Sequence, residues 1–372
     1  MSGTNKIPFF GVDRQYANIR EEILEVTDQV YTSGRVLDGH NTYMFEKTIQ
    51  KMTERKYACA VGSCTQALIF SLRAVDHPHK QHRSKVLIPS QSFVASLNAV
   101  IESGFDPVFC DVDPITGLID LNKIPVHYSE IAAIMYVNLF GNIIDYDKLT
   151  AYKQMWSDDG IPVIEDAAQS FGAYYRGVPS GKLGTVSCLS FDPTKNLNNY
   201  GSGGMILTDD PGIWEDVNDM RDNGKGNEHV NSGTNSKMSE ADCAQMLVKL
   251  KYFNDWQLRR TEIADYYTSE LDGYVTIPSL DMNVEHAWSK YVIHHKDRAG
   301  IATFLKEAGI ETKINYPRPL HLTNVAFGFE VNYSQLAGAE EFSRSCLSLP
   351  IYPELTDSEV EAVVDTIKEY IS

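Results

Sequence analysis

The sequence predicts an α/β protein, with a mostly parallel sheet covered by helices on both faces and a smaller α+β domain after it. Short apolar runs alternate with helical segments between residues 57 and 210. These runs are apolar on both faces, which is typical of strands in a buried parallel sheet. The chain of 372 residues suits about two domains. We place the boundary near residue 250, giving a large domain of 1–250 and a small domain of 251–372.

The amino-terminal segment, residues 15–53, is predicted to be helical. Ile19, Ile23, Val26 and Val30 share one face at helical spacing. Seven short apolar runs follow, and we expect them to be strands at 57–62, 85–90, 106–113, 131–141, 162–168, 188–193 and 203–210. Helices are expected between them at 65–75, 92–104 and 146–160.

The carboxyl-terminal part predicts a different arrangement. A helical stretch at 239–271 precedes one strand candidate, WSKYVIHH at 288–295. Helices are expected at 300–310 and 358–371. One strand with helices around it favours a small α+β domain.

The composition excludes several classes of protein. Asp and Glu total 50 against 33 Lys and Arg, so the formal net charge is −17. Such a chain repels nucleic acid and anionic membranes, and we predict neither as a partner. No stretch reaches the about 20 apolar residues of a spanning helix.

The six cysteines indicate a reducing compartment. None forms a CxxC pair and most lie in apolar runs, which predicts buried free thiols and no metal site. The amino terminus has no long apolar core of a signal peptide. We therefore expect a cytoplasmic protein.

Two charged residues carry most of the chemical information. Asp166 ends the apolar run VIED, and Lys195 lies in the loop SFDPTKN after a second run. A lysine can form a Schiff base with an aldehyde, and a carboxylate can keep a pyridine nitrogen protonated. The pair therefore suggests a pyridoxal 5'-phosphate site, although a lysine in a polar loop is more often only solvated.

Other residues gain meaning beside this pair. The turn before the helix at 65–75 contains Thr65 and could bind phosphate at the helix start, or form only a capped helix. Phe93 could stack on a planar ring or pack in the core. Gln169 follows Asp166 by three and could face the same site. Ser190 could bind phosphate through its hydroxyl.

The motifs together resemble the DegT/DnrJ/EryC1/StrS family of sugar aminotransferases. Nine segments occur in the family's order over nearly the whole chain. They are Gly39 with FEKTIQ (45–50), SCTQAL (63–68), PSQSFVAS (89–96), YVNLFGNIIDYDKL (136–149), VIEDAAQSFGA (163–173), SFDPTKN (190–196), GTNSKMSEADCAQM (233–246), INYPRPLHL (314–322) and SLPIYPELTDSEV (348–360). The resemblance implies fold type I of the pyridoxal-phosphate enzymes.

The resemblance also implies roles for the cofactor site. Lys195 matches the Schiff-base lysine and Asp166 the partner of the pyridine nitrogen. Gln169 matches the donor to the phenolic oxygen, and Phe93 the aromatic residue that stacks on the ring. Three residues match the positions that bind the cofactor's phosphate: Cys64, Thr65 and Ser190.

Further matches concern a partner subunit and the substrate. Asn235 matches an asparagine that reaches the phosphate from the other subunit of a homodimer with a shared active site. Tyr316 and His321 match positions close to a nucleotide-sugar.

Four residues depart from the family's pattern. Cys64 stands where glycine is usual, so its side chain should point away from the phosphate. Asn138 stands where histidine is common, Asp192 where histidine or an aromatic residue is, and Lys237 where arginine is. We expect Asn138, Asp192 and Lys237 to shape the pocket for the sugar or the diphosphate.

The implied reaction is a transamination in two halves. L-glutamate gives its amino group to the cofactor and leaves as 2-oxoglutarate, and a dTDP- or UDP-linked deoxy-keto-sugar then takes the amino group. Amino-sugar and surface-glycan synthesis, such as lipopolysaccharide O-antigen, would use the product. Two alternatives stay open: a sugar dehydratase of the same fold, whose relatives carry histidine in place of Lys195, and a non-catalytic family member.

Overall fold

The computed structural model describes residues 6–75, 84–124, 130–156, 161–225 and 232–372. Its helices are α1 (Val12–Ser33), α2 (His40–Thr53), α3 (Cys64–Val75), α4 (Val94–Glu102), α5 (Tyr146–Trp156), α6 (Pro211–Met220), α7 (Glu240–Leu250), α8 (Phe253–Leu271), α9 (Arg298–Glu307), α10 (Ala337–Ser345) and α11 (Asp357–Ile371). Its strands are β1 (Tyr57–Val61), β2 (Lys85–Pro89), β3 (Asp106–Cys110), β4 (Ile131–Val137), β5 (Val163–Asp166), β6 (Tyr174–Tyr175), β7 (Val178–Pro179), β8 (Val186–Ser190), β9 (Gly204–Thr208), β10 (Val284–Glu285), β11 (Tyr291–His294) and β12 (Cys346–Leu349).

A seven-stranded sheet forms the centre of the large domain, in the order β1-β9-β8-β5-β4-β2-β3. Only β9 runs antiparallel to its neighbours, β1 and β8. The strands between β8 and β3 pair in parallel. The predicted mostly parallel α/β sheet is therefore confirmed, and all seven predicted strands are present in it.

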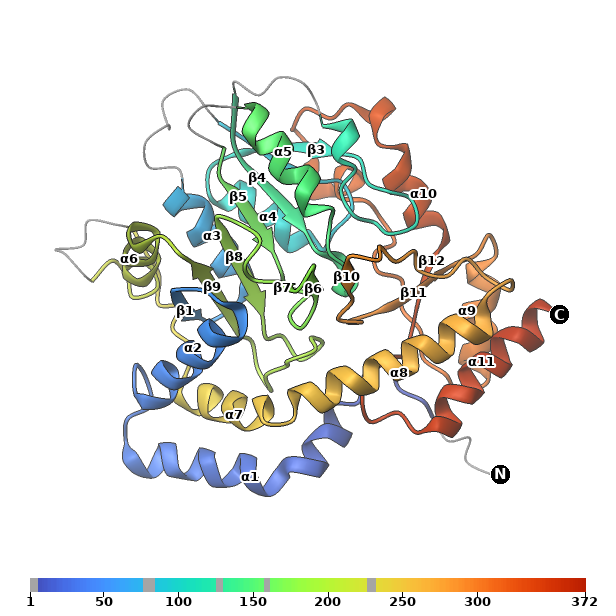
Figure 1. Ribbon diagram of the computed structural model, residues 1–372, viewed down its shortest axis with the longest axis horizontal. Helices are drawn as coiled ribbons and strands as arrows, with labels where there is room; N and C mark the ends of the chain where they lie inside the picture. The colour runs from blue at the N-terminus through green and yellow to red at the C-terminus, as the bar shows by residue number, and fades with distance from the viewer. Residues whose placement is uncertain (1–5, 76–83, 125–129, 157–160, 226–231) are drawn as a thin grey trace.

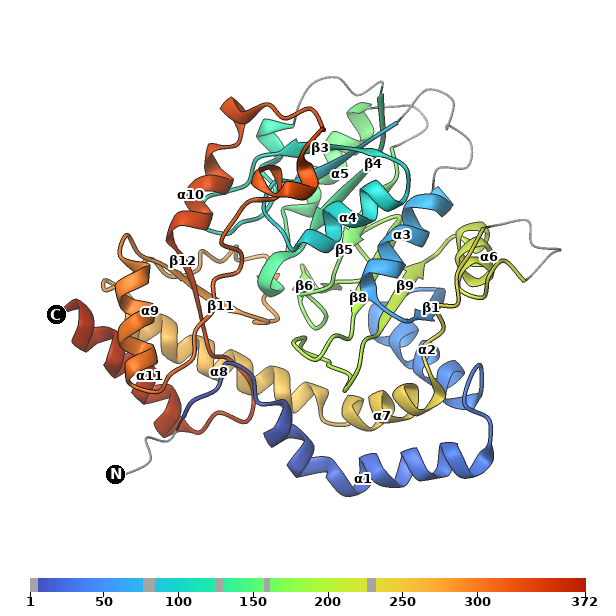
Figure 2. The same ribbon diagram turned by 180° about the vertical axis from the view of Figure 1, so that it is seen from behind.

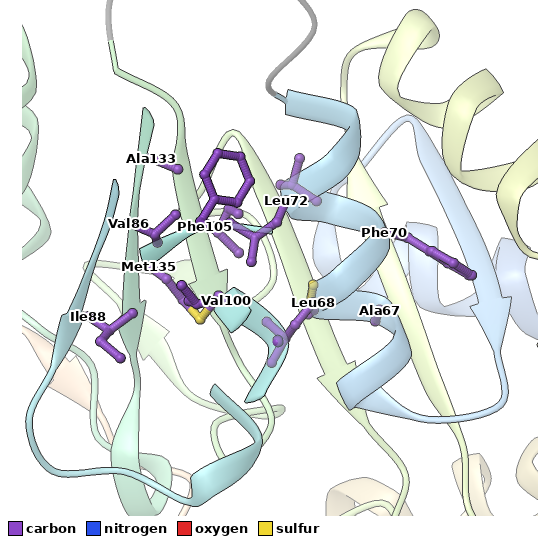
Figure 3. Close-up of a cluster of buried hydrophobic side chains, with 14 of the residues drawn as sticks. Ala67, Leu68, Phe70, Leu72, Val86, Ile88, Val100, Phe105, Ala133 and Met135 are labelled. Atoms are coloured by element: carbon purple, nitrogen blue, oxygen red, sulfur yellow. The ribbon is translucent and has the colours of Figure 1, made fainter. Parts of the chain in front are cut away.

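Helices cover both faces of this sheet. Helix α5 lies in front of the strands in Figure 1, and α3 and α4 lie in front in the reverse view of Figure 2. Leu68 and Leu72 of α3 are fully buried and point toward the sheet, where they meet Met135 of β4 (Figure 3). Burial of such a leucine stabilises the fold by about 2 kcal/mol.

The remaining helices connect the sheet to the carboxyl-terminal part. Helices α1 and α2 pack on α7, and α8 continues from α7 toward α11 (Figure 1). There β11 and β12 form a two-stranded antiparallel sheet that packs with α9, α10 and α11. The division of the chain at residue 250 stays a prediction.

The structure corrects several element boundaries. The amino-terminal helical segment is broken after Ser33, where Gly34 adopts φ of 69° and ends α1. The stretch at 239–271 is two helices, α7 and α8. The sequence analysis missed α6, although Asp210 caps it and Pro211 begins it. The end of the predicted helix at 146–160 lies outside the described residues after 156.

Within the described ranges, no helix is long and apolar enough to cross a membrane. All six cysteines are buried and free, as the sequence predicts.

Candidate active site

The carboxyl ends of the parallel strands meet at one edge of the sheet, and most of the predicted site residues gather there. Strand β5 ends on Asp166, β8 ends on Ser190, and Phe93 follows β2. A cavity of about 390 Å³ opens at this edge, a size typical of small-molecule sites. The predicted residues that line it are Cys64, Thr65, Phe93, Asp166, Gln169, Ser190, Asp192, Lys195 and Tyr316.

Asp166 is a buried carboxylate aimed into the cavity. Its Oδ2 accepts a hydrogen bond of 2.8 Å from Ser96 Oγ, and its Oδ1 accepts one of 3.1 Å from the Ala168 backbone N–H. Loss of water raises the pKa of Asp166, while the bond from Ser96 and the charge of Lys195 oppose this effect. Such a carboxylate is suited to hold a cationic group that enters the cavity.

The neighbouring Glu165 points to the opposite side of the strand, as adjacent strand residues must. Its carboxylate is fully buried and accepts from Asn138 Nδ2 at 2.9 Å and Ser187 Oγ at 2.6 Å. The backbone N–H groups of Gly181 and Leu183 also donate to it. Glu165 therefore anchors the sheet, and Asp166 alone of the two serves the cavity.

The loop that carries Lys195 is held rigidly. The Lys195 backbone N–H donates to the Asp192 carbonyl at 2.9 Å, which closes a turn. Asn196 Nδ2 donates to the Ala287 carbonyl at 2.5 Å and to Gln257 Oε1 at 3.0 Å. These bonds tie the loop to α8 and to the segment before β11, so the Lys195 side chain is directed into the cavity.

Burial changes the acid–base behaviour of Lys195. Desolvation lowers its pKa, and the groups that oppose this are Cys64, Asp166 and Asp192. A lower pKa increases the fraction of free amine at neutral pH. The free amine is the form that attacks a carbonyl carbon or accepts a proton.

Three further side chains surround the cavity. Gln169 Oε1 accepts from the Phe140 backbone N–H at 3.2 Å, and its Nε2 lies 3.5 Å from the Tyr316 hydroxyl. Phe93 is 51% exposed, and its ring centroid lies 5.6 Å from that of Tyr316. A half-exposed ring that lines a cavity can stack on a planar ligand.

The other end of the cavity lies at the start of α3. The first backbone N–H groups of a helix have no partner within it, and the helix dipole is positive there. Thr65 and Ser190 line the cavity beside this helix start, which gives an anion site. Cys64 is buried and packs with the core cluster of α3.

The structure places three predicted residues away from the cavity lining. Asn138 is fully buried and donates to Glu165, and its contact with a substrate stays a prediction. His321 is 2% exposed and packs near Phe109 and Tyr333, outside the cavity lining, and its place near a substrate stays a prediction. Asn235 is exposed on the surface.

Comparison with known proteins gives a consistent result. Residues 17–368 match the DegT/DnrJ/EryC1/StrS aminotransferase family. This chain belongs to that family.

Two curated relatives cover nearly all of the aminotransferase. The "pleiotropic regulatory protein" of Geobacillus stearothermophilus is 33% identical, with 98% of each chain covered. A dTDP-3-amino-3,4,6-trideoxy-alpha-D-glucose transaminase of Streptomyces venezuelae is 31% identical, over 99% of this chain and 97% of the relative. A DegT/DnrJ/EryC1/StrS aminotransferase from Brucella abortus has the same fold, with a TM-score of 0.92, 29% identity and coverage of 98% and 100%.

The donor set of the cavity fits pyridoxal 5'-phosphate, the cofactor of this family. Asp166 offers a desolvated carboxylate for the ring nitrogen, and Lys195 offers an amine. The start of α3, where Ser63 Oγ accepts from the Gln66 backbone N–H at 3.2 Å, offers the positive end of the helix dipole for the phosphate. Phe93 offers an open ring face. Each of these four groups of the cofactor would therefore meet a chemically matched partner.

Three charged or polar residues that matter for this cavity were among those that sequence reasoning missed. Ser96 directly orients Asp166, and its signal was its place three residues after Phe93 on the first turn of α4. Lys290 and Lys313 also line the cavity. They come from the carboxyl-terminal part of the chain, and nothing in their local sequence connects them with Lys195.

Proposed function

We propose that this aminotransferase binds pyridoxal 5'-phosphate in the cavity at Lys195 and moves an amino group from L-glutamate to the ketone of a nucleotide-linked deoxy-sugar. The observation that carries the proposal is the buried Asp166 facing the same cavity as the Lys195 amine. The cofactor, when bound, supplies an electron-accepting ring. The substrate class rests on the transaminase relative that acts on a dTDP-sugar.

The residues of this chain would divide the work. Asp166, held by Ser96, would keep a positive charge on the ring nitrogen. Lys195 would release the cofactor when the donor amine arrives, and its free amine would then carry the proton between the donor carbon and the cofactor carbon. Gln169 would donate to the ring oxygen, and Phe93 would cover the ring face. Thr65 and Ser190 would hold the phosphate.

A panel of keto-sugars with L-glutamate tests this function. The protein is loaded with pyridoxal 5'-phosphate and supplied with dTDP- and UDP-linked 3-keto- and 4-keto-sugars, and amino-sugar is detected by mass spectrometry. Replacing Lys195 by alanine should abolish product and the visible absorbance of the lysine-bound cofactor. Lys306→Ala, on an exposed residue of α9, is the matched control.

The two alternatives predict different results. A dehydratase would release water from the sugar without consuming glutamate, and Lys195 argues against it. A non-catalytic member would leave the absorbance of the cofactor unchanged when glutamate is added. This alternative is tested because the Geobacillus relative is named a regulatory protein. Near-normal turnover by Lys195→Ala would refute the proposed function.

We infer that the enzyme is a homodimer with a shared active site. Asn235 is exposed and does not line the cavity of its own chain, which fits a residue that serves a partner. Apolar side chains on α1 and α2 are also exposed, among them Tyr31 and Tyr43. Mixing Lys195→Ala with Asn235→Ala subunits should restore activity, because some mixed dimers then contain one intact site. Failure to complement, with a dimer present by light scattering, would argue against sharing.

A further inference from the structure

The cavity contains two lysines that the transamination described above does not use. Lys290 and Lys313 line it together with Lys195, whereas its lining carboxylates are Asp166 and Asp192. With the cofactor bound, Asp166 would face the ring nitrogen and Lys195 the cofactor carbon. The positive charge of Lys290 and Lys313 would then be available to a substrate.

The structure fixes the position of both lysines. Lys290 immediately precedes β11, and its backbone N–H donates to the Phe140 carbonyl at 3.3 Å. Lys313 exchanges two backbone hydrogen bonds with Ser348 of β12, at 3.2 and 2.7 Å. Since β11 and β12 pair with each other, the small sheet holds the two lysines near one another.

One aromatic ring connects the two ammonium groups. The Nζ of Lys290 lies 5.1 Å from the centroid of Phe10, and that of Lys313 lies 4.6 Å from the same centroid. Phe10 also lines the cavity. Two cations gathered at one ring, beside the reacting amine, favour an anionic ligand between them.

The hydrogen bonds of Lys290 leave room for such a ligand. Its side chain is 8% exposed, and its Nζ donates to the carbonyls of Ser289 at 2.9 Å and Thr194 at 3.3 Å. An ammonium group has three donors, so one remains. Burial, and then the charge of Lys195, lower the pKa of Lys290 well below its usual range. An entering anion would reverse this effect and favour the charged form.

No carboxylate of the described part of the chain forms an ion pair with either lysine. The acid nearest in sequence to Lys313 is Glu311, which is bound by Lys6 Nζ at 2.5 Å and by the Phe9 backbone N–H at 3.1 Å. Asp192 Oδ1 accepts from the Thr194 backbone N–H at 3.0 Å. Asp192 acts on Lys290 and Glu311 on Lys313 through their charges, but neither carboxylate holds its lysine in an ion pair.

We propose that Lys290 and Lys313 form an anion subsite of the reactive cavity, which binds a carboxylate carried by one of the two substrates. The inference rests on the proposed function, since it assigns the ligand of that same cavity. The carboxylate can come from the amino donor, as in glutamate and 2-oxoglutarate. It can also come from the sugar, as in a uronic acid. Both sources present the same chemistry to the two ammonium groups.

Three ligands separate the two sources. The first is 2-oxoglutarate, whose binding to the pyridoxal-loaded enzyme is measured by calorimetry without turnover. The others are a UDP-linked 3-keto-sugar with a hydroxymethyl group at C6 and its uronic acid counterpart, compared by KM and kcat. Lys290→Met and Lys313→Met keep much of each aliphatic stem and remove the charge. Lys306→Met is the control, and Lys313→Arg should restore binding.

We expect each methionine variant to weaken one carboxylate ligand at least tenfold, while the neutral sugar changes less than twofold. Loss confined to 2-oxoglutarate would assign the subsite to the donor, and loss confined to the uronic acid would assign it to the acceptor. Values equal to those of Lys306→Met for all three ligands would overturn the proposal.

Two further outcomes are equally informative. An equal loss with both sugars and with UDP alone would place the lysines on the diphosphate, and would also overturn the assignment. If wild-type enzyme aminates no sugar at all, the proposed function fails, and the calorimetric result for 2-oxoglutarate still decides the subsite.

Discussion

Replacing Glu165 by glutamine should destabilise the fold and leave the chemistry of the cavity in place. Glu165 is fully buried behind Asp166 and acts only as an acceptor of hydrogen bonds. A glutamine has nearly the same shape, but one of its two terminal atoms is a donor. The groups that donate to the carboxylate are Asn138 Nδ2, Ser180 Oγ, Ser187 Oγ and the backbone N–H groups of Gly181 and Leu183.

The size of the effect follows from these donors. Whichever carboxylate oxygen becomes the amide nitrogen, about two of the donors then face another donor. A buried donor without an acceptor costs about 1–3 kcal/mol. We therefore expect Glu165→Gln to lower the free energy of unfolding by about 4 kcal/mol, a large share of the stability of a typical protein. The melting temperature should fall by at least about 5 °C.

The assay is thermal unfolding followed by circular dichroism, on cofactor-loaded protein at neutral pH. Glu102→Gln, on an exposed residue at the end of α4, is the matched control and should change the melting temperature by less than about 1 °C. At a temperature where Glu165→Gln is still folded, the absorbance of the bound cofactor should match that of the wild type.

Two results would refute this reasoning. If Glu165→Gln has the same melting temperature as Glu102→Gln, the hydrogen bonds to Glu165 do not stabilise the sheet. If it melts normally and loses the cofactor's absorbance, Glu165 and not Asp166 is the carboxylate that faces the ring nitrogen.

Asp166→Asn should lower kcat about 100-fold or more and change the melting temperature little, because it removes a charge that acts on the ligand in the cavity. A kcat equal to that of the wild type would contradict this prediction. Ser96→Ala removes a bond that lowers the pKa of Asp166, so the acid limb of the kcat profile should move to higher pH. An unmoved limb would show that Ser96 does not set this pKa. Lys249 is buried, and desolvation lowers its pKa to about 7. The same side chain has a pKa of about 10.4 in an unfolded chain, so between pH 7 and about 10 the folded protein binds fewer protons than the unfolded one. The free energy of unfolding should therefore rise with pH over this range. Lys249→Met should flatten this rise in melting temperature, and a slope equal to that of the wild type would exclude Lys249 as its source.

Much of the fold could be predicted from the local pattern of apolar residues in the sequence. The seven apolar runs became the seven strands of the sheet because a strand buried on both faces leaves a continuous apolar signal. Helix breaks were harder to place. Gly34 ends α1 through its positive φ, and such a break interrupts the helical period only briefly. The short strand β12 has only four residues and pairs with β11 from far along the chain, so its local signal was weak.

The site could be predicted where its reactive residues lie close together in the sequence. Asp166 and Gln169 lie within one turn, and Lys195 lies in a loop with recognisable neighbours. The placement of Asn138 and His321 was harder to predict, because a residue's position in a motif does not say which way its side chain points. Packing turned both of them away from the cavity.

The sequence by itself determined the chain order of the seven strands of the large sheet, the adjacent carboxylates of the VIED run and the lysine loop, since each depends on residues close together in the chain. Only the tertiary structure decided which carboxylate faces the cavity, because strand alternation must be referred to the rest of the sheet. It also decided that Lys290 and Lys313 lie beside Lys195. Charges separated by about a hundred residues meet only when the carboxyl-terminal part of the chain packs against the large sheet, and no local pattern encodes that contact.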